Sequence, residues 1–486
     1  MLHQPPPIYP DAAASDTGLL SAVVAGQARL SGPQALDLFR TMPLPELARW
    51  ADARCRALHG NSIRTYVIDR NINYTNVCTA RCTFCAFRRD GDEHDAYTLD
   101  PSKIEEKIGE LSAIGGTQIL MQGGMNPDLP LDWYLNLLAG IKERYPHIHV
   151  HAFSPPELIE FVHFFNPPGN TLFDKCRWVL AKLQDAGLDS LPGGGGEIFA
   201  EPVRKKIGLG KATADAWLTT MYAAHSLGMH TSATMMFGHI EGHADRVHHM
   251  TTVRDWQDHA LNGGTHPGIG SDNSTPLSAG RGVNQPWGHY KAFISWPFQR
   301  ENTPLGRVKD WGSRDTDTGD FPGDVVAALT GDGNPKAHPE FGRRVRMSSA
   351  TDYLRTQALS RLVLDNVYSI GASWVTMGPH IGQVALMFGA NDMGSVMMEE
   401  NVVSSAGTTY CLDEAVLCRL IRDAGFLPAQ RNNTYDILTL HDSQKSPDLA
   451  VTDWSTHRAQ KLHAEQDKGV KAEATAELTV SAAGTN

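Results

Sequence analysis

The sequence predicts an α/β fold in which eight short strands alternate with helices. Two observations predict it: short runs rich in apolar and β-branched residues recur along the chain, and the segments between them repeat apolar residues at helical spacing. Because a helix between two strands returns the chain to the starting edge of the sheet, the alternation indicates parallel strands. Eight such units favour a closed (β/α)8 barrel of the TIM type over an open sheet.

The elements are expected in alternating order along the chain. The strands are expected at 65–76, 117–124, 148–154, 190–199, 231–241, 291–299, 372–378 and 390–399. The helices are expected at 102–115, 131–146, 176–188, 213–229, 244–259, 351–366, 381–389 and 413–426. The fourth and eighth strands have the weakest patterns, because consecutive glycines interrupt the fourth and because the eighth fits a loop equally well. A partly open barrel is therefore the alternative.

A helical extension is expected before the barrel, over residues 1–62. Leu47, Ala51 and Cys55 recur at helical spacing, and the Gly60 that follows is a stop signal. The barrel is then expected to span 63–432.

Two stretches interrupt the alternation, at 260–289 and 305–348. Both are rich in Gly, Pro, Asp and Ser and lack apolar periodicity, so they are expected to be loop insertions on the barrel. The C-terminal segment 433–486 is expected to be a polar tail, partly disordered, because it is charged and rich in alanine.

Composition excludes several classes of protein. The formal net charge of −11 disfavours a nucleic-acid partner, which usually asks for a basic face. No apolar run is long enough to span a bilayer, and the first residues do not have the pattern of a signal peptide. The expected location is the cytoplasm. Seven cysteines in a chain of this size do not indicate a disulfide framework.

Three cysteines stand close together just after the first expected strand. Cys78, Cys82 and Cys85 have C-x3-C-x2-C spacing, and three thiolates can hold three irons of a [4Fe–4S] cluster. The fourth iron would then stay open to an amine and a carboxylate of a small molecule. The alternatives are a zinc site, which would want a fourth ligand, and unrelated core cysteines. A strand-end loop places the trio at the barrel mouth, where such folds keep their chemistry.

Other polar residues follow later strands. Glycines at the end of the second strand and before Glu197 would let the backbone approach a ligand closely, although both segments also fit plain turns. Of three alternating histidines on the third strand, only His151 is expected to reach the mouth. Glu241, Trp296 and Asn391 lie in segments at the ends of later strands and could contact a substrate, although packing and solvated roles are equally compatible with them.

The cysteine motif, with an aromatic residue before its last cysteine, resembles the radical S-adenosylmethionine superfamily. Within it, the segments RNINYTNVC, CTFCAF, ILMQGGMNPDL, HAFSPPE, LPGGGGEI, SATMMFGHIE and ASWVTMGPHIGQVALMFGANDMGS resemble the cyclic dehypoxanthine futalosine synthases of menaquinone biosynthesis. The similarity covers about residues 30–432 apart from the insertions. The family usually has Ala where this chain has Gly196.

The resemblance implies roles for particular residues. Cys78, Cys82 and Cys85 would bind the cluster, and Phe84 would pack near the adenine of S-adenosyl-L-methionine. The remaining expected cofactor contacts are Gln122, Gly123, Gly124, Gly195 and Glu197. The expected catalytic residues are His151, Glu157 and Glu241, and the expected substrate contacts are Ser154, Trp296 and Asn391.

The resemblance also implies a reaction. A reduced flavodoxin or ferredoxin would supply an electron, and a 5′-deoxyadenosyl radical would take the ribose C4′ hydrogen of dehypoxanthine futalosine, which then cyclises. The alternatives are an aminofutalosine synthase or a deazaflavin-forming synthase. A non-catalytic iron–sulfur or zinc protein is a more distant alternative.

Overall fold

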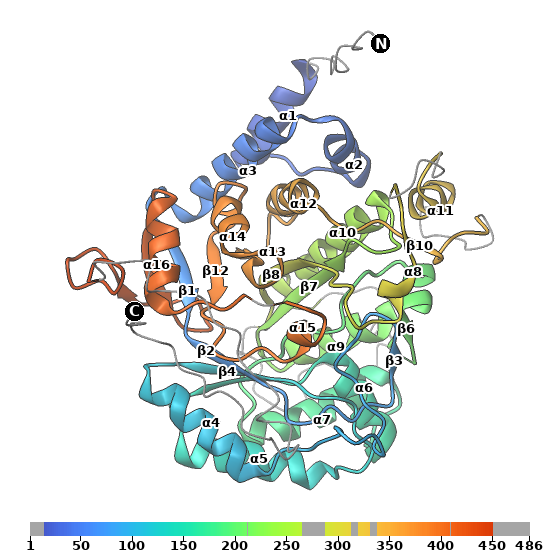
Figure 1. The fold of residues 1–486 in the computed structure, drawn as a ribbon, viewed down its shortest axis with the longest axis vertical. Coiled ribbons are helices and arrows are strands. Elements are labelled where there is room, and N and C mark those ends of the chain that lie inside the picture. Colours follow the sequence, from blue (N-terminus) through green and yellow to red (C-terminus); the bar gives the residue numbers. More distant parts are fainter. Residues whose placement is uncertain are drawn as a thin grey trace, which may run out of the picture.

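Parallel strands occupy the centre of the molecule and helices cover them on the outside (Figure 1). The structure is a computed structural model and describes residues 14–210, 212–264, 287–312, 319–330, 338–408 and 410–450.

The strands follow one another around a ring. One sheet has the order β14-β13-β1-β12-β11-β8-β7, and a second has the order β2-β4-β5. Pairing is parallel throughout, except between β13 and β14. The bounds are β1 (Ile63–Val67), β2 (Asp69–Ile72), β4 (Gln118–Met121), β5 (His149–Ala152), β7 (Thr231–Phe237), β8 (Tyr290–Pro297), β11 (Ser369–Gly371), β12 (Asp392–Ser395), β13 (Leu427–Arg431) and β14 (Ile437–Leu440).

Two junctions join these sheets into the ring. Only Ile68 separates β1 from β2, so one stretch of chain pairs with β12 on one side and with β4 on the other. On the opposite side, isolated bridges link His151 to Ser190 and Leu191 to Thr231, where a fourth strand would stand. The expected TIM-barrel-like α/β architecture is confirmed, with single bridges in place of a continuous ladder at the Gly-rich segment.

Helices return the chain between the strands. In chain order they are α4 (Pro101–Ala113), α5 (Leu131–Arg144), α6 (Pro155–Phe165), α7 (Leu172–Ala186), α8 (Glu201–Ile207), α9 (Ala214–Ser226), α10 (His243–Leu261), α12 (Ala350–Val363), α13 (Trp374–Met377), α14 (Pro379–Ala385), α15 (Val402–Ser405) and α16 (Glu414–Asp423). The prediction of a strand at 372–378 is wrong. That segment forms α13, and the strand β11 ends just before it, because Ser373 and Trp374 begin a helical turn.

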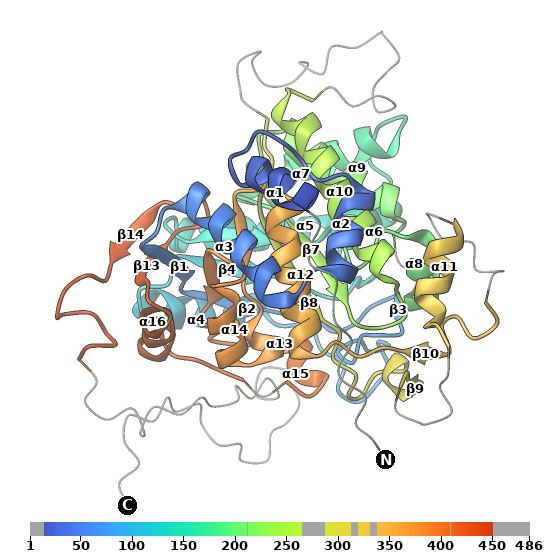
Figure 2. The same cartoon turned by 90° about the horizontal axis from the view of Figure 1, so that it is seen from above.

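The N-terminal helices pack on one side of the ring, against α10 and α12 (Figures 1 and 2). They are α1 (Ala14–Val24), α2 (Gly32–Thr41) and α3 (Leu44–His59). Leu47, Ala51 and Cys55 of α3 are buried, as their spacing predicts. Arg29 fixes the segment further, because its guanidinium pairs with Asp258 and with Asp365 at 2.6 Å.

Two segments have more regular structure than the sequence predicts. The second insertion contains η1 (Leu305–Arg307), the pair of short strands β9 (Lys309–Asp310) and β10 (Arg344–Val345), and α11 (Pro322–Thr330), which packs on α10. The expected polar tail begins with β14, and buried Asp448 pairs with Arg422. Most of the first insertion, 265–286, and the residues after 450 lie outside the described residues.

None of the helices in the described part of the chain is long and apolar enough to cross a membrane.

Candidate active site

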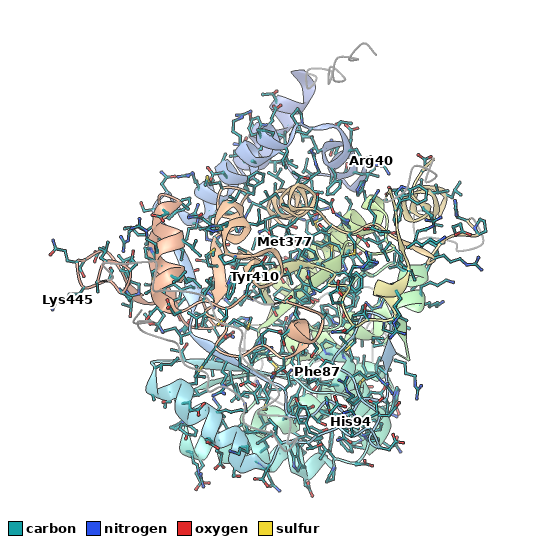
Figure 3. All side chains as sticks on the ribbon, viewed as in Figure 1. Arg40, Phe87, His94, Met377, Tyr410 and Lys445 are labelled. Atoms are coloured by element: carbon teal, nitrogen blue, oxygen red, sulfur yellow. The ribbon has the colours of Figure 1, made fainter. Side chains whose placement is uncertain are left out.

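A cavity of about 280 Å³ lies at the carboxyl ends of the strands. Loops after β2, β4, β5 and β8 line it, together with Met236 of β7, the Gly-rich segment before α8, and α15 from the C-terminal half of the chain. In Figures 1 and 2, α15 lies on the side of the ring toward the viewer of Figure 1. Figure 3 labels Phe87, a lining residue, just below it. The cavity therefore lies where parallel barrels have their active sites.

The three cysteines of the motif all line this cavity. Cys78, Cys82 and Cys85 are half-buried, and none of them forms a disulfide. Their loop is well fixed, because the Cys78 N–H donates to Arg89 O at 3.1 Å and the Cys85 N–H donates to Cys82 O at 3.2 Å. Burial raises the pKa of the Cys78 thiol above its ordinary value.

The donor set fits a cluster better than a single ion. In the described residues no three His, Cys, Asp or Glu side chains converge to hold one metal ion. A cubane instead asks for one thiolate on each of three irons, so its ligands surround a volume and do not meet at a point. Three thiols that line the same cavity fit that demand.

Glycines let the strand ends approach one another beside the thiols. A Cβ on Gly124 would lie 2.1 Å from the carbonyl oxygen of Val77, and one on Gly193 would lie 2.6 Å from that of Ser232. No side chain fits at these distances, so backbone forms this part of the wall. A Cβ on Gly196 would also lie 2.4 Å from Thr234 O, so the alanine usual in the resembling family would require Thr234 to shift.

Glu157 is the most densely hydrogen-bonded acid in the lining. It lies in the first turn of α6, an element that the sequence interpretation missed, and the Ser154 that caps this helix donates to it at 2.6 Å. The Tyr74 hydroxyl donates at 2.6 Å and the Gly123 N–H at 3.1 Å. Burial nevertheless raises the pKa of Glu157 to about 7. Its carboxyl thus ties the ends of three successive strands together at one point.

Glu197 has a strained backbone, with φ of 40° in the left-handed region. Buried Arg204 holds this turn by donating to Gly196 O at 2.6 Å, Gly195 O at 3.1 Å and Ile198 O at 3.2 Å. Such a conformation persists only where the surroundings enforce it. The Gly-rich turn is therefore a rigid part of the cavity wall.

The short helix α15 closes another side of the cavity. Val402, Val403 and Ala406 face it and supply apolar surface. The carboxylate of Glu400 accepts hydrogen bonds from the backbone N–H groups at the start of this helix. Buried Glu399 anchors the preceding segment by pairing with Arg70 at 2.6 Å and with Lys107 at 3.0 Å.

Most of the residues predicted for the site come together here. The cavity is lined by Cys78, Cys82, Phe84, Cys85, Gln122, Gly123, Gly124, Ser154, Glu157, Gly195, Glu197 and Trp296. Many of them, such as Gln122, Gly123 and Gly124, follow a strand directly, which is a position that the sequence pattern predicts.

His151 and Asn391 lie outside this lining. His151 contacts the Ser190 hydroxyl at 2.6 Å, and burial lowers its pKa to about 3. Asn391 precedes β12 and therefore lies at the amino end of that strand, where its Oδ1 accepts from Arg361 at 2.6 Å and from the Ile370 N–H at 2.8 Å. Both side chains are engaged within the fold, so the predicted catalytic and substrate-binding roles have no support in this arrangement.

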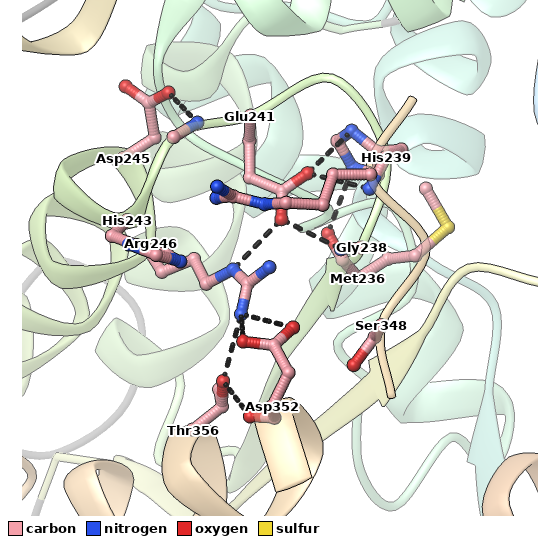
Figure 4. Close-up of polar contacts among 12 residues, drawn as sticks. Met236, Gly238, His239, Glu241, His243, Asp245, Arg246, Ser348, Asp352 and Thr356 are labelled. Atoms are coloured by element: carbon pink, nitrogen blue, oxygen red, sulfur yellow. Dashed lines mark hydrogen bonds and ion pairs between the residues drawn. The ribbon is translucent and has the colours of Figure 1, made fainter. Parts of the chain in front are cut away.

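Glu241 also lies outside the lining, within a buried group that we term the β7 network: His239, Glu241, Arg246 and Asp352 (Figure 4). Its Oε1 accepts from Gly238 N–H at 2.7 Å and Arg246 Nε at 2.8 Å, and its Oε2 from His239 N–H at 2.9 Å. Burial opposes ionisation, but His239 and Arg246 hold the pKa of Glu241 well below its ordinary value. The carboxylate turns toward the helices because its cationic partner lies on α10.

Several lining residues had no signal in the sequence. They are Asn73, Asn76, Arg88, Gln299, Thr376 and the apolar side chains of α15. The first three flank the cysteine motif, so proximity to it was a usable clue. Thr376 and α15 reach the cavity only through tertiary packing.

Comparisons with known proteins agree with this geometry. The family model described as the radical SAM superfamily matches residues 72–253. A second, described as the CofH/MqnC C-terminal region, matches residues 340–444. The first therefore spans the thiols, the Gly-rich turns and Glu157, and the second spans α15.

Two named relatives cover most of the chain. A cyclic dehypoxanthine futalosine synthase from Halalkalibacterium halodurans is 37% identical over 429 residues, which is 88% of this chain and 96% of that protein. A 5-amino-6-(D-ribitylamino)uracil–L-tyrosine 4-hydroxyphenyl transferase from Methanopyrus kandleri is 35% identical over 375 residues, which is 76% of this chain and 84% of that protein.

A solved structure has the same fold. Methylornithine synthase superimposes with a TM-score of 0.56, covering 85% of this chain and 97% of that chain, at 16% sequence identity. At that identity the similarity concerns the fold alone.

Proposed function

Since the chain belongs to the radical SAM superfamily, in a group of enzymes with cyclic dehypoxanthine futalosine synthases, aminodeoxyfutalosine synthases and FO synthases, we propose that it cyclises dehypoxanthine futalosine in menaquinone biosynthesis. Members of this superfamily use a [4Fe–4S] cluster and S-adenosylmethionine. The observation that carries the choice of reaction is the 37% identity to a named cyclase, with 96% of that protein covered.

The geometry supports a radical reaction in general. The residues that would hold the cluster are Cys78, Cys82 and Cys85, since all three line the cavity. When bound, the cluster and S-adenosylmethionine supply a carbon radical able to abstract a hydrogen from an unactivated sugar position.

The protein must then position the sugar and exclude other hydrogen donors. Backbone at Gly124 lies close to Cys78, and Glu197 on its rigid turn lines the same cavity. Val402, Val403 and Ala406 cover the cavity with apolar surface. Apolar cover restricts water, and fixed backbone restricts the poses that the sugar can adopt, so one hydrogen is presented to the radical.

Glu157 is suited to hold a proton near the reacting molecules. Its pKa of about 7 means that the protonated and ionised forms coexist near neutral pH. Tyr74, Ser154 and Gly123 fix its carboxyl in place. Loss of a proton after cyclisation therefore has an acceptor in the cavity wall.

The test is turnover by anaerobically reconstituted enzyme with S-adenosylmethionine, dithionite and dehypoxanthine futalosine. The expected product has lost a pair of hydrogens, and deuterium placed at C4′ of the ribose is expected in 5′-deoxyadenosine. Mass spectrometry reads both, and a Cys82→Ala variant is the control for background chemistry.

Two outcomes would replace the proposal. Turnover of 3-[(1-carboxyvinyl)oxy]benzoate, with the adenosyl group added to it, would assign the enzyme to the aminofutalosine branch. Turnover of tyrosine with 5-amino-6-(D-ribitylamino)uracil would assign it to the transferase branch. A cyclic product without deuterium transfer from C4′ would overturn the position of hydrogen abstraction.

A further inference from the structure

Arg88 is the sole lysine or arginine among the described residues that line the cavity. It follows Phe87 in the loop that carries the three thiols, and its side chain is only 17% exposed. Its Nε is buried and has no hydrogen-bond partner within the described residues. A buried guanidinium N–H without an acceptor is costly, so this atom calls for an acceptor that the fold does not supply.

The local charge favours an anionic acceptor. Arg88 donates through Nη2 to Asp90, but Asp90 is shared with Arg81, whose Nη2 lies 3.4 Å from the same carboxylate oxygen. Two guanidinium groups on one carboxylate leave an excess positive charge at this end of the cavity. Glu157 forms no ion pair with Arg88 within the described residues, and its carboxyl accepts from Tyr74, Ser154 and Gly123 instead.

The loop around Arg88 is held in place before any ligand arrives. The backbone N–H of Arg89 donates to Asn76 O at 2.8 Å, and its Nε–H is shared between the two carboxylate oxygens of Asp95 at 2.7 and 2.8 Å. A cation fixed in this way loses little conformational freedom on binding, which favours affinity.

We propose that Arg88 binds a carboxylate of a molecule held in the cavity. Guanidinium groups recognise carboxylates through charge-assisted hydrogen bonds, and Nε–H is available for one. Under the proposed function, which this inference rests on, two carboxylates could serve: the benzoate group of the substrate and the methionine end of S-adenosylmethionine. The chemistry recognised is the same, and the experiment separates the two sources.

The experiment measures dissociation constants by anaerobic calorimetry with reconstituted protein, and KM and kcat separately. The probes are dehypoxanthine futalosine, its benzoate methyl ester and S-adenosylmethionine. The variants are Arg88→Gln and Arg88→Lys. The matched control is Arg81→Gln, because Arg81 contacts the same Asp90 but is 68% exposed and lies outside the cavity lining.

Arg88→Gln is expected to weaken binding of one carboxylate probe roughly 10- to 100-fold, since a hydrogen bond to a charged group is lost. Arg88→Lys is expected to recover part of the loss, because it keeps the charge without the planar fork. If the substrate is the ligand, the methyl ester binds the wild type and Arg88→Gln equally. Iron content and circular dichroism are expected to match the wild type, as are all constants of Arg81→Gln.

The outcomes divide cleanly. A selective loss for dehypoxanthine futalosine assigns the benzoate carboxylate to Arg88, and a selective loss for S-adenosylmethionine assigns the methionine carboxylate. Unchanged binding of both by folded, iron-loaded Arg88→Gln protein overturns the inference. Failure of the wild type to bind or convert dehypoxanthine futalosine overturns the proposed function instead, and the S-adenosylmethionine measurement then decides the role of Arg88 by itself.

Discussion

The cavity and the β7 network are both rich in charged groups near the carboxyl ends of strands, yet they differ in how those groups are used. In the network, both oxygens of Glu241 and both oxygens of Asp352 accept from the chain itself, and the unpartnered Nη2 of Arg246 lies away from the cavity lining. In the cavity, Arg88 Nε and Asn73 Oδ1 are buried without a partner within the described residues.

The difference shows how a site is told apart from a structural cluster. A fully engaged buried carboxylate has no capacity left for a ligand, and its partners serve to offset its desolvation. A buried polar atom without a partner raises the energy of the ligand-free protein, and a ligand that satisfies it recovers that energy. Titratable residues alone do not mark an active site; unmet hydrogen-bonding capacity beside a cavity does.

The largest effect is expected at the thiols. Cys82→Ala is expected to abolish turnover completely and to lower iron content, because one iron loses its anchor. Cys411→Ser is the matched control, since Cys411 is also half-buried but lies outside the cavity lining. Iron analysis and visible absorption provide the measurement. If Cys82→Ala kept full iron content and full turnover, the cavity would not be the site of the reaction.

The next largest effect is expected in the β7 network. Arg246→Ala leaves Glu241 and Asp352 without their shared cation, and breaking a buried ion pair typically costs about 3–5 kcal/mol. Urea unfolding is expected to show this loss, whereas iron bound per folded molecule stays at the wild-type level.

The control for this change is Arg419→Ala, which removes an exposed pair with Asp423 and is expected to cost less than about 1 kcal/mol. If Arg246→Ala kept wild-type stability and lost turnover, the network would belong to the reactive region and the comparison would fail.

A third effect concerns Glu157, whose pKa burial raises to about 7 from an ordinary value of 4.5. The folded state then holds the proton more tightly than the unfolded state. The corresponding stability is fully present below about pH 4.5 and is lost as the pH rises through 7, by about 3 kcal/mol in total.

Glu157→Gln is expected to remove this loss, so the free energy of unfolding at pH 8 rises relative to the wild type. The amide keeps the geometry, since its oxygen accepts from Tyr74 and Gly123 and its nitrogen donates to Ser154. Urea unfolding between pH 5 and 8 makes the measurement, with Glu160→Gln on the same helix as control. Parallel pH profiles for the wild type and Glu157→Gln would contradict the assignment.

Sequence patterns predict strand ends well, and for this reason many residues of the cavity could be predicted from the sequence. Cys78 and Gly124 each follow a strand, and parallel strands bring their carboxyl ends to one edge. The spacing of the cysteines in addition indicated an iron–sulfur site at that edge. Residues near each other in sequence carried this part of the prediction.

What the sequence could not reveal depends on contacts between distant segments. Glu241 follows β7 as Gly124 follows β4, but Arg246 and Asp352 draw its carboxylate toward the helices. The eighth strand begins at Asp392, so Asn391 lies at the opposite end from the cavity. α15 reaches the cavity through Glu399 and its pair with Arg70, whose partners are 329 residues apart. No local pattern encodes such pairings.

The smallest effects on stability and binding are expected for two asparagines. One is fully hydrogen-bonded within the fold and the other lines the cavity, so together they test the contrast between the network and the cavity at single residues. Asn391 uses Oδ1 for Arg361 and for the Ile370 N–H, whereas Asn73, which lines the cavity, has a buried Oδ1 without a partner within the described residues. Asn391→Ala strands a buried guanidinium N–H and a backbone N–H, which is expected to lower the free energy of unfolding by about 1–3 kcal/mol.

Asn73→Ala is expected to change stability by less than about 1 kcal/mol, because the hydrogen bond from Nδ2 to Gln122 O at 3.0 Å is lost together with an unsatisfied acceptor. Its effect belongs to the ligand: binding of S-adenosylmethionine or dehypoxanthine futalosine is expected to weaken roughly 5- to 10-fold, the value of one neutral hydrogen bond. Asn391→Ala is expected to leave both affinities unchanged. Calorimetry measures the two affinities and urea unfolding measures the stability of each variant. If Asn73→Ala lowered stability as much as Asn391→Ala and bound both ligands normally, Asn73 Oδ1 would have a partner inside the protein and would not contact a ligand.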